Sequence, residues 1–368
     1  RTLIMSCNTG AGHNSCAKAI QEVYQERGEL CDIVDALQFI SPHASRFISN
    51  WHTRIYLHAP KFFSAGYEKA EEKDDLFREG TPVYKYITSG ADRMYDYIVT
   101  NGYDNVICTH VFPALALTEV LRRHPGLSIT TSHVSTDYTC SPCTADSRLD
   151  WYFMPSGLLK DEFVRCGIPE DKLIASGMPV RKAFYQASDK AQAKKALGIA
   201  PSQTHLLMMC GSMGCGPMER ITELLANSLP LEYDVTVACS SNRQLLRRME
   251  RRFADKPNIH IRGFISNVSV LMDSADLFLT KPGGISTTEA MVKGLPMVLV
   301  NVVGGCETPN LNFFVSHGGA ATAGTPEDIA ALCRELLEND EERLIMRQSL
   351  LAMKQIPAAQ AICDRLEG

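Results

Sequence analysis

The chain has 368 residues, a formal net charge of −5 and a sequence pI near 6.1. Its length suggests roughly two domains, and hydrophobic residues, at 45% of the chain, are plentiful enough for two cores. The mild acidity argues against nucleic acid as the main partner, because nucleic-acid-binding domains are usually basic.

Short apolar runs alternate with amphipathic helical stretches along nearly the whole chain. The expected strands cover residues 2–6, 31–35, 105–109, 128–134, 150–154, 206–210, 233–238, 259–261, 276–280 and 297–301. This alternation predicts an α/β fold with mostly parallel sheets. The pattern restarts near residue 204, after a polar and helix-like stretch. We therefore expect two doubly wound, Rossmann-like domains that face each other across a cleft.

We expect the first domain to cover residues 1–185 and the second 186–345. We expect a C-terminal helix over residues 346–368. Whether this helix crosses back to the first domain stays open. No apolar run approaches the roughly 18 residues of a membrane span, and the first strand leads directly into a glycine-rich turn, so we expect no signal peptide. The thirteen cysteines are an odd number, with several in expected strands. They indicate free thiols in a reducing cytosol.

Three strand–turn–helix units carry glycine-rich turns. They read Asn8-Thr9-Gly10-Ala11-Gly12-His13, Gly211-Ser212-Met213-Gly214-Cys215-Gly216 and Lys281-Pro282-Gly283-Gly284. Glycines let a phosphate approach the backbone, and the free N–H groups of the following helix attract anions. One such turn is compatible with an ordinary βα connection, but three indicate phosphate binding on a doubly wound sheet. After the third turn, Glu289 lies one helical turn further on, within reach of a ribose hydroxyl pair.

One segment without acidic residues interrupts the alternation, between Asp35 and Glu68. Its cations include Arg46, Arg54 and Lys61, and its aromatic residues include Trp51, Phe62 and Phe63. Aromatic side chains interleaved with cations suit an interface with anionic lipid headgroups. A buried helical insertion with a solvated basic edge is the alternative.

Several motifs together resemble one glycosyltransferase family, that of the monogalactosyldiacylglycerol synthases and processive diacylglycerol glucosyltransferases. The motifs are the three glycine turns, Thr109-His110-Val111-Phe112-Pro113, Ser135-Thr136-Asp137-Tyr138, Gly177-Met178-Pro179-Val180-Arg181, Arg262-Gly263-Phe264 and Gly305-Cys306-Glu307-Thr308-Pro309-Asn310. The resemblance covers nearly the whole chain. It implies the GT-B fold and a relationship to the peptidoglycan enzyme MurG.

The resemblance implies a UDP-sugar site in the second domain. Glu289 would hold the ribose, and the backbone near Phe264 would read the uracil. Glu307 and Asn310 would bond sugar hydroxyls. The residues implied for the diphosphate are Arg181, Gly211, Ser212, Met213, Gly214, Gly283 and Gly284. Neither a metal nor a cofactor is expected, because helix dipoles and Arg181 would neutralise the departing UDP.

The resemblance also implies an inverting reaction, in which a base removes the proton of the acceptor hydroxyl. His13 is the candidate base, because it ends a glycine loop and an imidazole titrates near neutrality. Asp137 would either orient His13 or be the base itself. His110 is expected to cap a helix or to pack. Family members commonly have Gln where Cys306 stands, so the identity of the donor sugar stays open.

The expected function is therefore transfer of a hexose from UDP-glucose or UDP-galactose to a lipid, with diacylglycerol as the implied acceptor. We expect a cytoplasmic enzyme at the inner face of the cell membrane. There Trp51, Arg54, Lys61, Phe62 and Phe63 would contact the acceptor and the anionic membrane surface. Three alternatives stay open: a MurG-like transferase to a polyprenyl-linked acceptor, a UDP-sugar epimerase, and a UDP-sugar sensor without catalysis.

Overall fold

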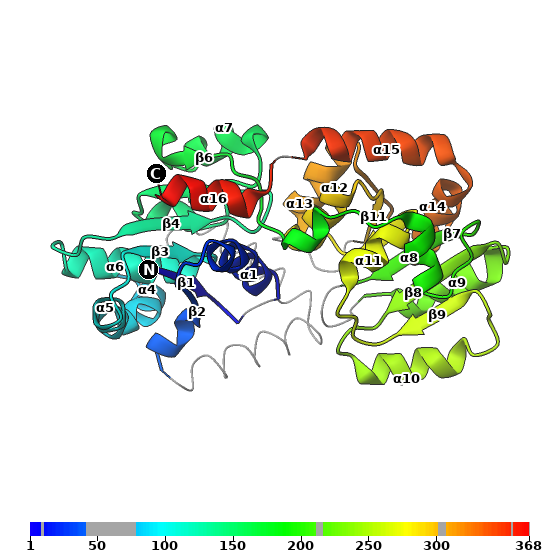
Figure 1. The fold of residues 1–368 in the computed structure, drawn as a ribbon, viewed down its shortest axis with the longest axis horizontal. Coiled ribbons are helices and arrows are strands. Elements are labelled where there is room, and N and C mark those ends of the chain that lie inside the picture. The colour runs from blue at the N-terminus through cyan, green and yellow to red at the C-terminus, as the bar shows by residue number, and fades with distance from the viewer. Residues whose placement is uncertain (9–10, 42–78, 211–215, 301–306, 355, 368) are drawn as a thin grey trace. The chain divides into compact units, whose positions relative to one another are not determined.

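The computed structural model describes residues 1–8, 11–41, 79–210, 216–300, 307–354 and 356–367. The chain forms two compact units (Figure 1). Unit 1 comprises Arg1–Lys182 together with Gln355–Gly368, and unit 2 comprises Ala183–Lys354. Each unit is a parallel sheet with its own helices, so the predicted doubly wound α/β fold is confirmed.

In the part of the chain that the structure describes, unit 1 contains six parallel strands in the order β2-β1-β3-β4-β5-β6. The strands are β1 (Thr2–Ser6), β2 (Cys31–Asp35), β3 (Asn105–Cys108), β4 (Thr130–Val134), β5 (Trp151–Phe153) and β6 (Leu173–Ile174). Ile4 of β1 pairs with Ile33 on one side and with Ile107 on the other. All five residues of β1 are buried, as expected for a central parallel strand.

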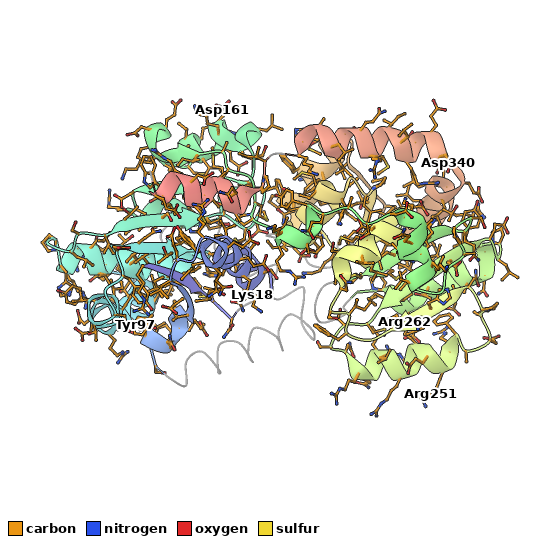
Figure 2. The ribbon with its side chains drawn as sticks, in the orientation of Figure 1. Lys18, Tyr97, Asp161, Arg251, Arg262 and Asp340 are labelled. Atoms are coloured by element: carbon orange, nitrogen blue, oxygen red, sulfur yellow. The ribbon has the colours of Figure 1, made fainter. Side chains whose placement is uncertain are left out.

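The helices of unit 1 follow the strands in alternation. They are α1 (Ala11–Glu26), α4 (Pro82–Ile87), α5 (Ala91–Thr100), α6 (Val111–Arg123), α7 (Lys160–Arg165) and α16 (Ala358–Glu367). Short 3₁₀ turns lie at Ala36–Phe39, Thr88–Gly90, Thr144–Asp146, Gly157–Leu159 and Glu170–Lys172. Charged side chains such as Lys18 on α1 project outward from the ribbon (Figure 2).

Unit 2 repeats the architecture with strand order β12-β11-β10-β7-β8-β9, again all parallel. The strands are β7 (Thr204–Met209), β8 (Tyr233–Ala238), β9 (Ile259–Arg262), β10 (Leu277–Thr280), β11 (Met297–Leu299) and β12 (Ala320–Thr322). The helices are α8 (Lys190–Ala196), α9 (Met218–Ser228), α10 (Arg243–Arg252), α11 (Val268–Ser274), α12 (Gly284–Lys293), α13 (Glu307–Ser316), α14 (Pro326–Glu338) and α15 (Asp340–Met353). A further 3₁₀ turn covers Lys182–Phe184, where the two units join.

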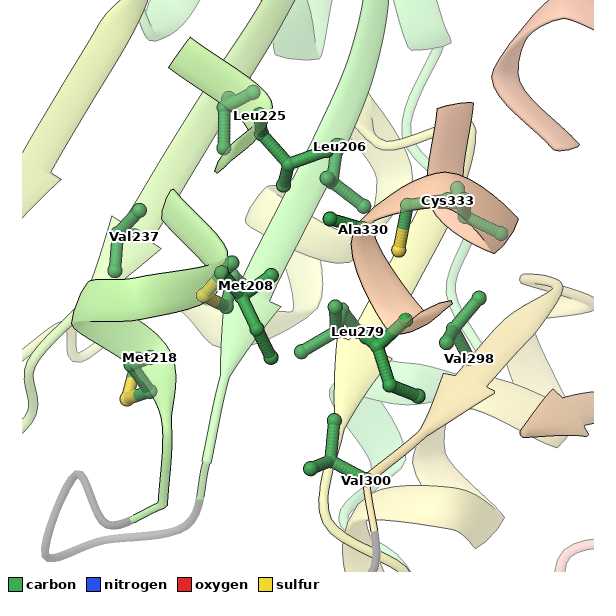
Figure 3. Packing of buried hydrophobic residues seen from close by; sticks show 14 of the residues in the cluster. Leu206, Met208, Met218, Leu225, Val237, Leu279, Val298, Val300, Ala330 and Cys333 are labelled. Carbon is green, nitrogen blue, oxygen red and sulfur yellow. The ribbon is translucent and has the colours of Figure 1, made fainter. Parts of the chain in front are cut away.

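The core of unit 2 lies between its sheet and α9, α10 and α14. Figure 3 shows Leu206 and Met208 of β7 beside Leu279 of β10, with Ala330 and Cys333 of α14 packed against them. Alternate strand residues face this layer because side chains along a strand point to opposite faces of the sheet. The core fixes the C-terminal ends of β7 and β10, where the candidate ligand-binding turns begin.

The end of the chain differs from the single helix predicted over 346–368. α15 ends at Met353 in unit 2, and α16 begins at Ala358 in unit 1. Pro357 directly precedes α16, and a proline disfavours helical conformation in the residue before it. α16 packs beside α1 (Figure 1). Arg27, just past the end of α1, forms ion pairs with Asp364 and Glu367.

No helix within the described ranges combines the length and the apolar composition that crossing a membrane requires.

Candidate functional site

The candidate catalytic residues of unit 1 lie where its strand order reverses. β1 lies between β2 and β3 in the sheet, and the chain passes from β1 to β2 before it returns to β3. In a doubly wound sheet, ligands bind at the carboxyl ends of the two strands at this switch point. His13 is the third residue of α1, which follows β1, and Thr109 directly follows β3. The fold therefore places both residues at the switch point.

The imidazole of His13 is held through its Nδ1 atom. This atom lies 2.8 Å from the carbonyl oxygen of Thr109 and 3.0 Å from the hydroxyl oxygen of Thr136. A carbonyl oxygen can only accept a hydrogen bond, so Nδ1 carries the proton and donates it. In the neutral ring the lone pair is then on Nε2. This is the arrangement that a general base requires.

Two further histidines lie near His13 and have different surroundings. His110 caps α6: its Nδ1 accepts a hydrogen bond from the backbone N–H of Phe112 at 3.0 Å. This confirms the expected capping role, and the ring of His110 meets that of His13 edge-on at 4.6 Å between centroids. His133 is buried in β4, and burial, together with the nearby His13 ring, lowers its pKa to about 4. A neutral His133 adds no positive charge that would oppose protonation of His13.

Sequence reasoning missed Thr136 and named its neighbour Asp137. Asp137 is half-buried in the loop that follows β4. The contact with Thr136 joins residues 123 positions apart, and the one with Thr109 uses a backbone oxygen. Thr109 and Thr136 each belong to a motif of the family resemblance, but sequence reasoning assigned neither residue a role beside His13. The choice between His13 and Asp137 as the base stays a prediction.

A chain of hydrogen bonds ties the start of α1 to the ends of β1 and β2. Ser6 donates to Asn14 at 2.6 Å, Asn14 donates to Asn8 at 2.9 Å, and Asn8 donates to Asp35 at 2.8 Å. Asp35 also accepts from the backbone N–H of Leu37. Because Asn14 adjoins His13, this network fixes the first turn of α1 and thereby the direction of the His13 side chain.

In unit 2 the strand order reverses between β7 and β10, so the third glycine turn, which follows β10, lies at its switch point. Gly283 is the N-cap of α12, with an extended backbone, and α12 begins at Gly284. The first backbone N–H groups of α12 therefore lie at the end of β10, where an anion would meet the positive end of the helix dipole. Glu289 is half-buried in the second turn of α12.

Two buried side chains of α13 contact the turn before α12. Glu307 forms an ion pair with Lys281, and Asn310 donates from Nδ2 to the carbonyl oxygen of Pro282 at 3.0 Å. Glu307 and Asn310 are three residues apart, so they lie on the same face of α13. The structure thus brings Glu307 and Asn310 to the turn that precedes α12, and their role in binding a ligand stays a prediction.

The other predicted residues fall into two groups. Phe264 follows β9 at the edge of the unit 2 sheet formed by the C-terminal ends of the strands, and 80% of its surface is exposed. Arg181 is half-buried and lies near the end of the Arg1–Lys182 stretch of unit 1. The predicted residues outside the described ranges are Gly211, Ser212, Met213, Gly214, Trp51, Arg54, Lys61, Phe62 and Phe63. Within the described ranges, no group of three His, Cys, Asp or Glu side chains is arranged to hold a metal ion.

Comparison with known families agrees with the division into two units. Residues 13–180 match the model of the monogalactosyldiacylglycerol (MGDG) synthase family, and residues 208–350 match that of glycosyl transferases group 1. The chain therefore belongs to the glycosyltransferases, with an MGDG synthase-type first unit and a group 1 second unit. It is an enzyme, as the resemblance predicted.

Relatives and solved structures span both units. The chain is 24% identical to a processive diacylglycerol beta-glucosyltransferase of Staphylococcus epidermidis, covering 100% of this chain and 92% of the relative. It is 27% identical to one of Bacillus licheniformis, covering 95% and 90%. The structure of MurG from Acinetobacter baumannii aligns with a TM-score of 0.66 at 16% identity, covering 100% of this chain and 99% of MurG. A UDP-GlcNAc 2-epimerase from Neisseria meningitidis, bound to UDP-GlcNAc, aligns with a TM-score of 0.63 at 14% identity, covering 100% of both chains. These likenesses confirm the GT-B fold.

Proposed function

We propose that the chain transfers a hexose from a UDP-sugar, UDP-glucose or UDP-galactose, to diacylglycerol with inversion at the anomeric carbon. The observation that carries the proposal is the fixed His13 ring at the switch point of a unit matched by the MGDG synthase model. The relatives named as diacylglycerol beta-glucosyltransferases support the acceptor. The donor is supported by the phosphate-binding geometry of the turn before α12.

In this reaction the acceptor hydroxyl attacks the anomeric carbon while its proton passes to Nε2 of His13. The new bond joins the acceptor oxygen to the sugar, and the bond between the sugar and the β-phosphate oxygen breaks. The resulting imidazolium still donates from Nδ1 to Thr109 and Thr136, so its positive charge is stabilised by hydrogen bonds that already exist. If Asp137 is the base instead, the proton passes to its carboxylate.

On the donor side, the N-terminus of α12 would stabilise the charge that develops on the departing UDP, without a metal. Glu289 would bond the ribose, the backbone at Phe264 the uracil, and Arg181 with residues 211–214 the diphosphate. Glu307 and Asn310 would orient the sugar. The ion pair with Lys281 supports this role, because it fixes the Glu307 carboxylate beside the phosphate-binding turn.

We also propose that the enzyme works as a peripheral protein at the cytoplasmic face of a membrane, where diacylglycerol resides. The acid-free segment over 36–67 supports this assignment through its composition. Most of the segment, including Arg46, Arg54 and Lys61, lies outside the described residues. Each cation near an anionic surface contributes about 1 kcal/mol to binding, so these three cations would contribute about 3 kcal/mol.

The decisive experiment incubates the purified protein with diacylglycerol vesicles and radiolabelled UDP-glucose or UDP-galactose. Labelled glycolipid with a β linkage is the expected product. Transfer only to a polyprenyl-linked acceptor would indicate a MurG-like enzyme, and a changed sugar on UDP would indicate an epimerase. Donor binding in calorimetry without either reaction would indicate a sensor. A His13→Ala variant provides the control for contaminating transferases.

A further inference from the structure

A stripe of arginines runs along the outer face of α10 in unit 2. This ten-residue helix carries five arginines and one glutamate, Glu250. Leu245 and Met249 turn inward and join the hydrophobic core. All five arginine side chains are exposed, and Figure 2 shows Arg251 projecting from α10 away from the sheet.

The five arginines divide into two sets with different surroundings. Arg248 and Arg252 turn toward α9, where Glu219 and Glu223 neutralise them at N–O distances of 2.6–2.8 Å. The remaining three, Arg243, Arg247 and Arg251, are spaced four residues apart and therefore line one face of the helix.

These three side chains make no ion pair with any carboxylate that the structure describes. Within the stripe, Arg251 donates a hydrogen bond from Nε to the carbonyl oxygen of Arg247. Because the carboxylates of α9 are already engaged by Arg248 and Arg252, the charge of the stripe faces solvent. The stripe therefore presents its guanidinium groups to an external anion.

An exposed aromatic side chain lies on the loop that approaches α10. Gly263, at the end of β9, approaches α10 so closely that a Cβ atom added to it would lie 3.2 Å from Leu246 Cδ2. The next residue, Phe264, is 80% exposed. The uracil role proposed for this position concerns its backbone and leaves the exposed ring without an assigned role. Cations beside an exposed aromatic ring are typical of surfaces that lie on lipid headgroups.

The stripe begins at the edge of the sheet that carries the donor-binding turns. Asn242 caps α10 and lies shortly after the C-terminal end of β8, and the Lys281–Gly284 turn lies at the C-terminal end of β10. Since all strands of this sheet are parallel, the C-terminal ends of β8 and β10 lie at the same edge of the sheet.

We propose that Arg243, Arg247 and Arg251, with Phe264 on the loop that approaches α10, dock unit 2 on an anionic lipid surface. The proposal rests on the proposed function, since a lipid acceptor requires work at a membrane. It assigns unit 2 a membrane contact of its own, separate from the acid-free segment of unit 1. A lipid surface fits better than nucleic acid because the whole chain is acidic, at −5, and the exposed ring adds an apolar element beside the charges.

The test compares two double variants that lose the same charge. Arg247→Gln with Arg251→Gln removes part of the stripe and leaves the N-terminal end of α10 intact. Lys195→Gln with Arg334→Gln is the control, because both residues are exposed cations on other helices of unit 2, without a recorded ion pair among the described residues. Binding is measured by co-sedimentation with vesicles of equal parts phosphatidylglycerol and phosphatidylcholine, and with phosphatidylcholine alone.

We expect the stripe variant to bind the anionic vesicles about thirtyfold more weakly than the parent at low salt, since each cation at such a surface changes partitioning about fivefold. The difference shrinks at high salt, where screening has already weakened the parent. The control variant binds like the parent. Neither variant differs from the parent on phosphatidylcholine alone, and equal melting temperatures show that both are folded.

Parent-like binding of the stripe variant at low salt overturns the proposal, as does an equal loss in the control variant, which would show an effect of net charge alone. A stripe-dependent affinity for duplex DNA without vesicle binding also overturns it. Transfer to detergent-dispersed diacylglycerol separates this inference from the proposed function. Absence of transfer by the parent refutes the function, whereas normal transfer with stripe-independent vesicle binding refutes only the inference.

Discussion

The Nδ1 atom of His13 lies 2.8 Å from the carbonyl oxygen of Thr109, at the point where the strand order of unit 1 reverses. The acceptor is a backbone atom, so no substitution of the Thr109 side chain removes it. The fold itself therefore selects the tautomer with a lone pair on Nε2. The catalytic assignment of His13 rests on this relationship.

Removal of the His13 imidazole tests the assignment directly. His13→Ala should lower transfer by about 10²–10⁴-fold, the usual loss for a general base. Affinity for UDP should stay near that of the parent, because His13 is not among the residues proposed to bind UDP. Steady-state kinetics and calorimetry with UDP measure the two effects. In the parent, activity should also fall on the acid side as the imidazole takes up a proton. A variant that keeps most of its activity would move the role to Asp137.

Thr136 should act as a positioning residue for His13. Thr136→Val keeps the shape of the side chain and removes the oxygen 3.0 Å from Nδ1. The loss of about 1 kcal/mol for one hydrogen bond predicts a roughly fivefold lower kcat with an unchanged KM for the donor. The acid limb of the pH–rate profile should move to lower pH, because an acceptor that favours the imidazolium is gone. Thr136→Ser should behave like the parent, and an unmoved acid limb in the valine variant would leave Thr136 a merely structural role.

Glu289 provides a test of the ribose site. Glu289→Ala should weaken UDP binding by about 1–3 kcal/mol, the range for a hydrogen bond to a charged group. Calorimetry with UDP alone measures this loss. Glu335→Ala, at an exposed position on α14, is the matched control and should bind UDP like the parent. Equal affinities of both variants would show that the ribose lies elsewhere.

The ion pair between Glu307 and Lys281 should stabilise unit 2 before any ligand binds. Glu307→Gln keeps the size of the side chain but leaves the ammonium group of Lys281 without its countercharge. We expect a loss of about 1–3 kcal/mol in the free energy of unfolding, since the ion pair is largely buried. UDP affinity should change little, while turnover of the UDP-sugar should fall. Urea unfolding monitored by circular dichroism measures the stability, and an unchanged midpoint would contradict the structural role of the pair.

Two buried histidines make stability depend on pH, one in each unit. Burial lowers the pKa of His133 and of His205 to about 4, below the value near 6.5 that an unfolded chain has. The unfolded state therefore binds more protons between pH 6.5 and pH 4. Stability is complete above pH 6.5 and falls with pH through this window, by about 1.4 kcal/mol per pH unit for each histidine.

Urea unfolding at pH 7 and at pH 5 measures this dependence. His205→Gln should remove the contribution of this histidine to the pH dependence of the unfolding free energy, because glutamine does not titrate. The amide group of the glutamine can still bond Thr236 or Ser274. His317→Gln changes an exposed histidine of the same unit and should leave the pH dependence unaltered. Identical pH dependence in the parent and His205→Gln would contradict the prediction.

Strong periodicity made the ten expected strands predictable, and each appears within two residues of its expected bounds. The two strands that were missed lack the apolar run on which the prediction depends: β6 has only two residues, and β12 reads Ala-Ala-Thr. The roles of the glycine turns and of Glu307 stay predictions, drawn from chemistry that is local in sequence. The partners of His13 were not predictable, because packing of three strand ends, rather than a motif, brings Thr109 and Thr136 to the ring.

The return of α16 to unit 1 has a consequence for the order in which the protein is made. The ribosome releases all of unit 2 before it releases residues 358–367, whereas the first stretch of unit 1 emerges earliest. Unit 2 is continuous in sequence and has all its strands as soon as it is synthesised. Unit 1 has its six strands early but lacks the helix that covers α1 and pairs with Arg27. The unit that carries His13 is thus begun first during translation and completed last.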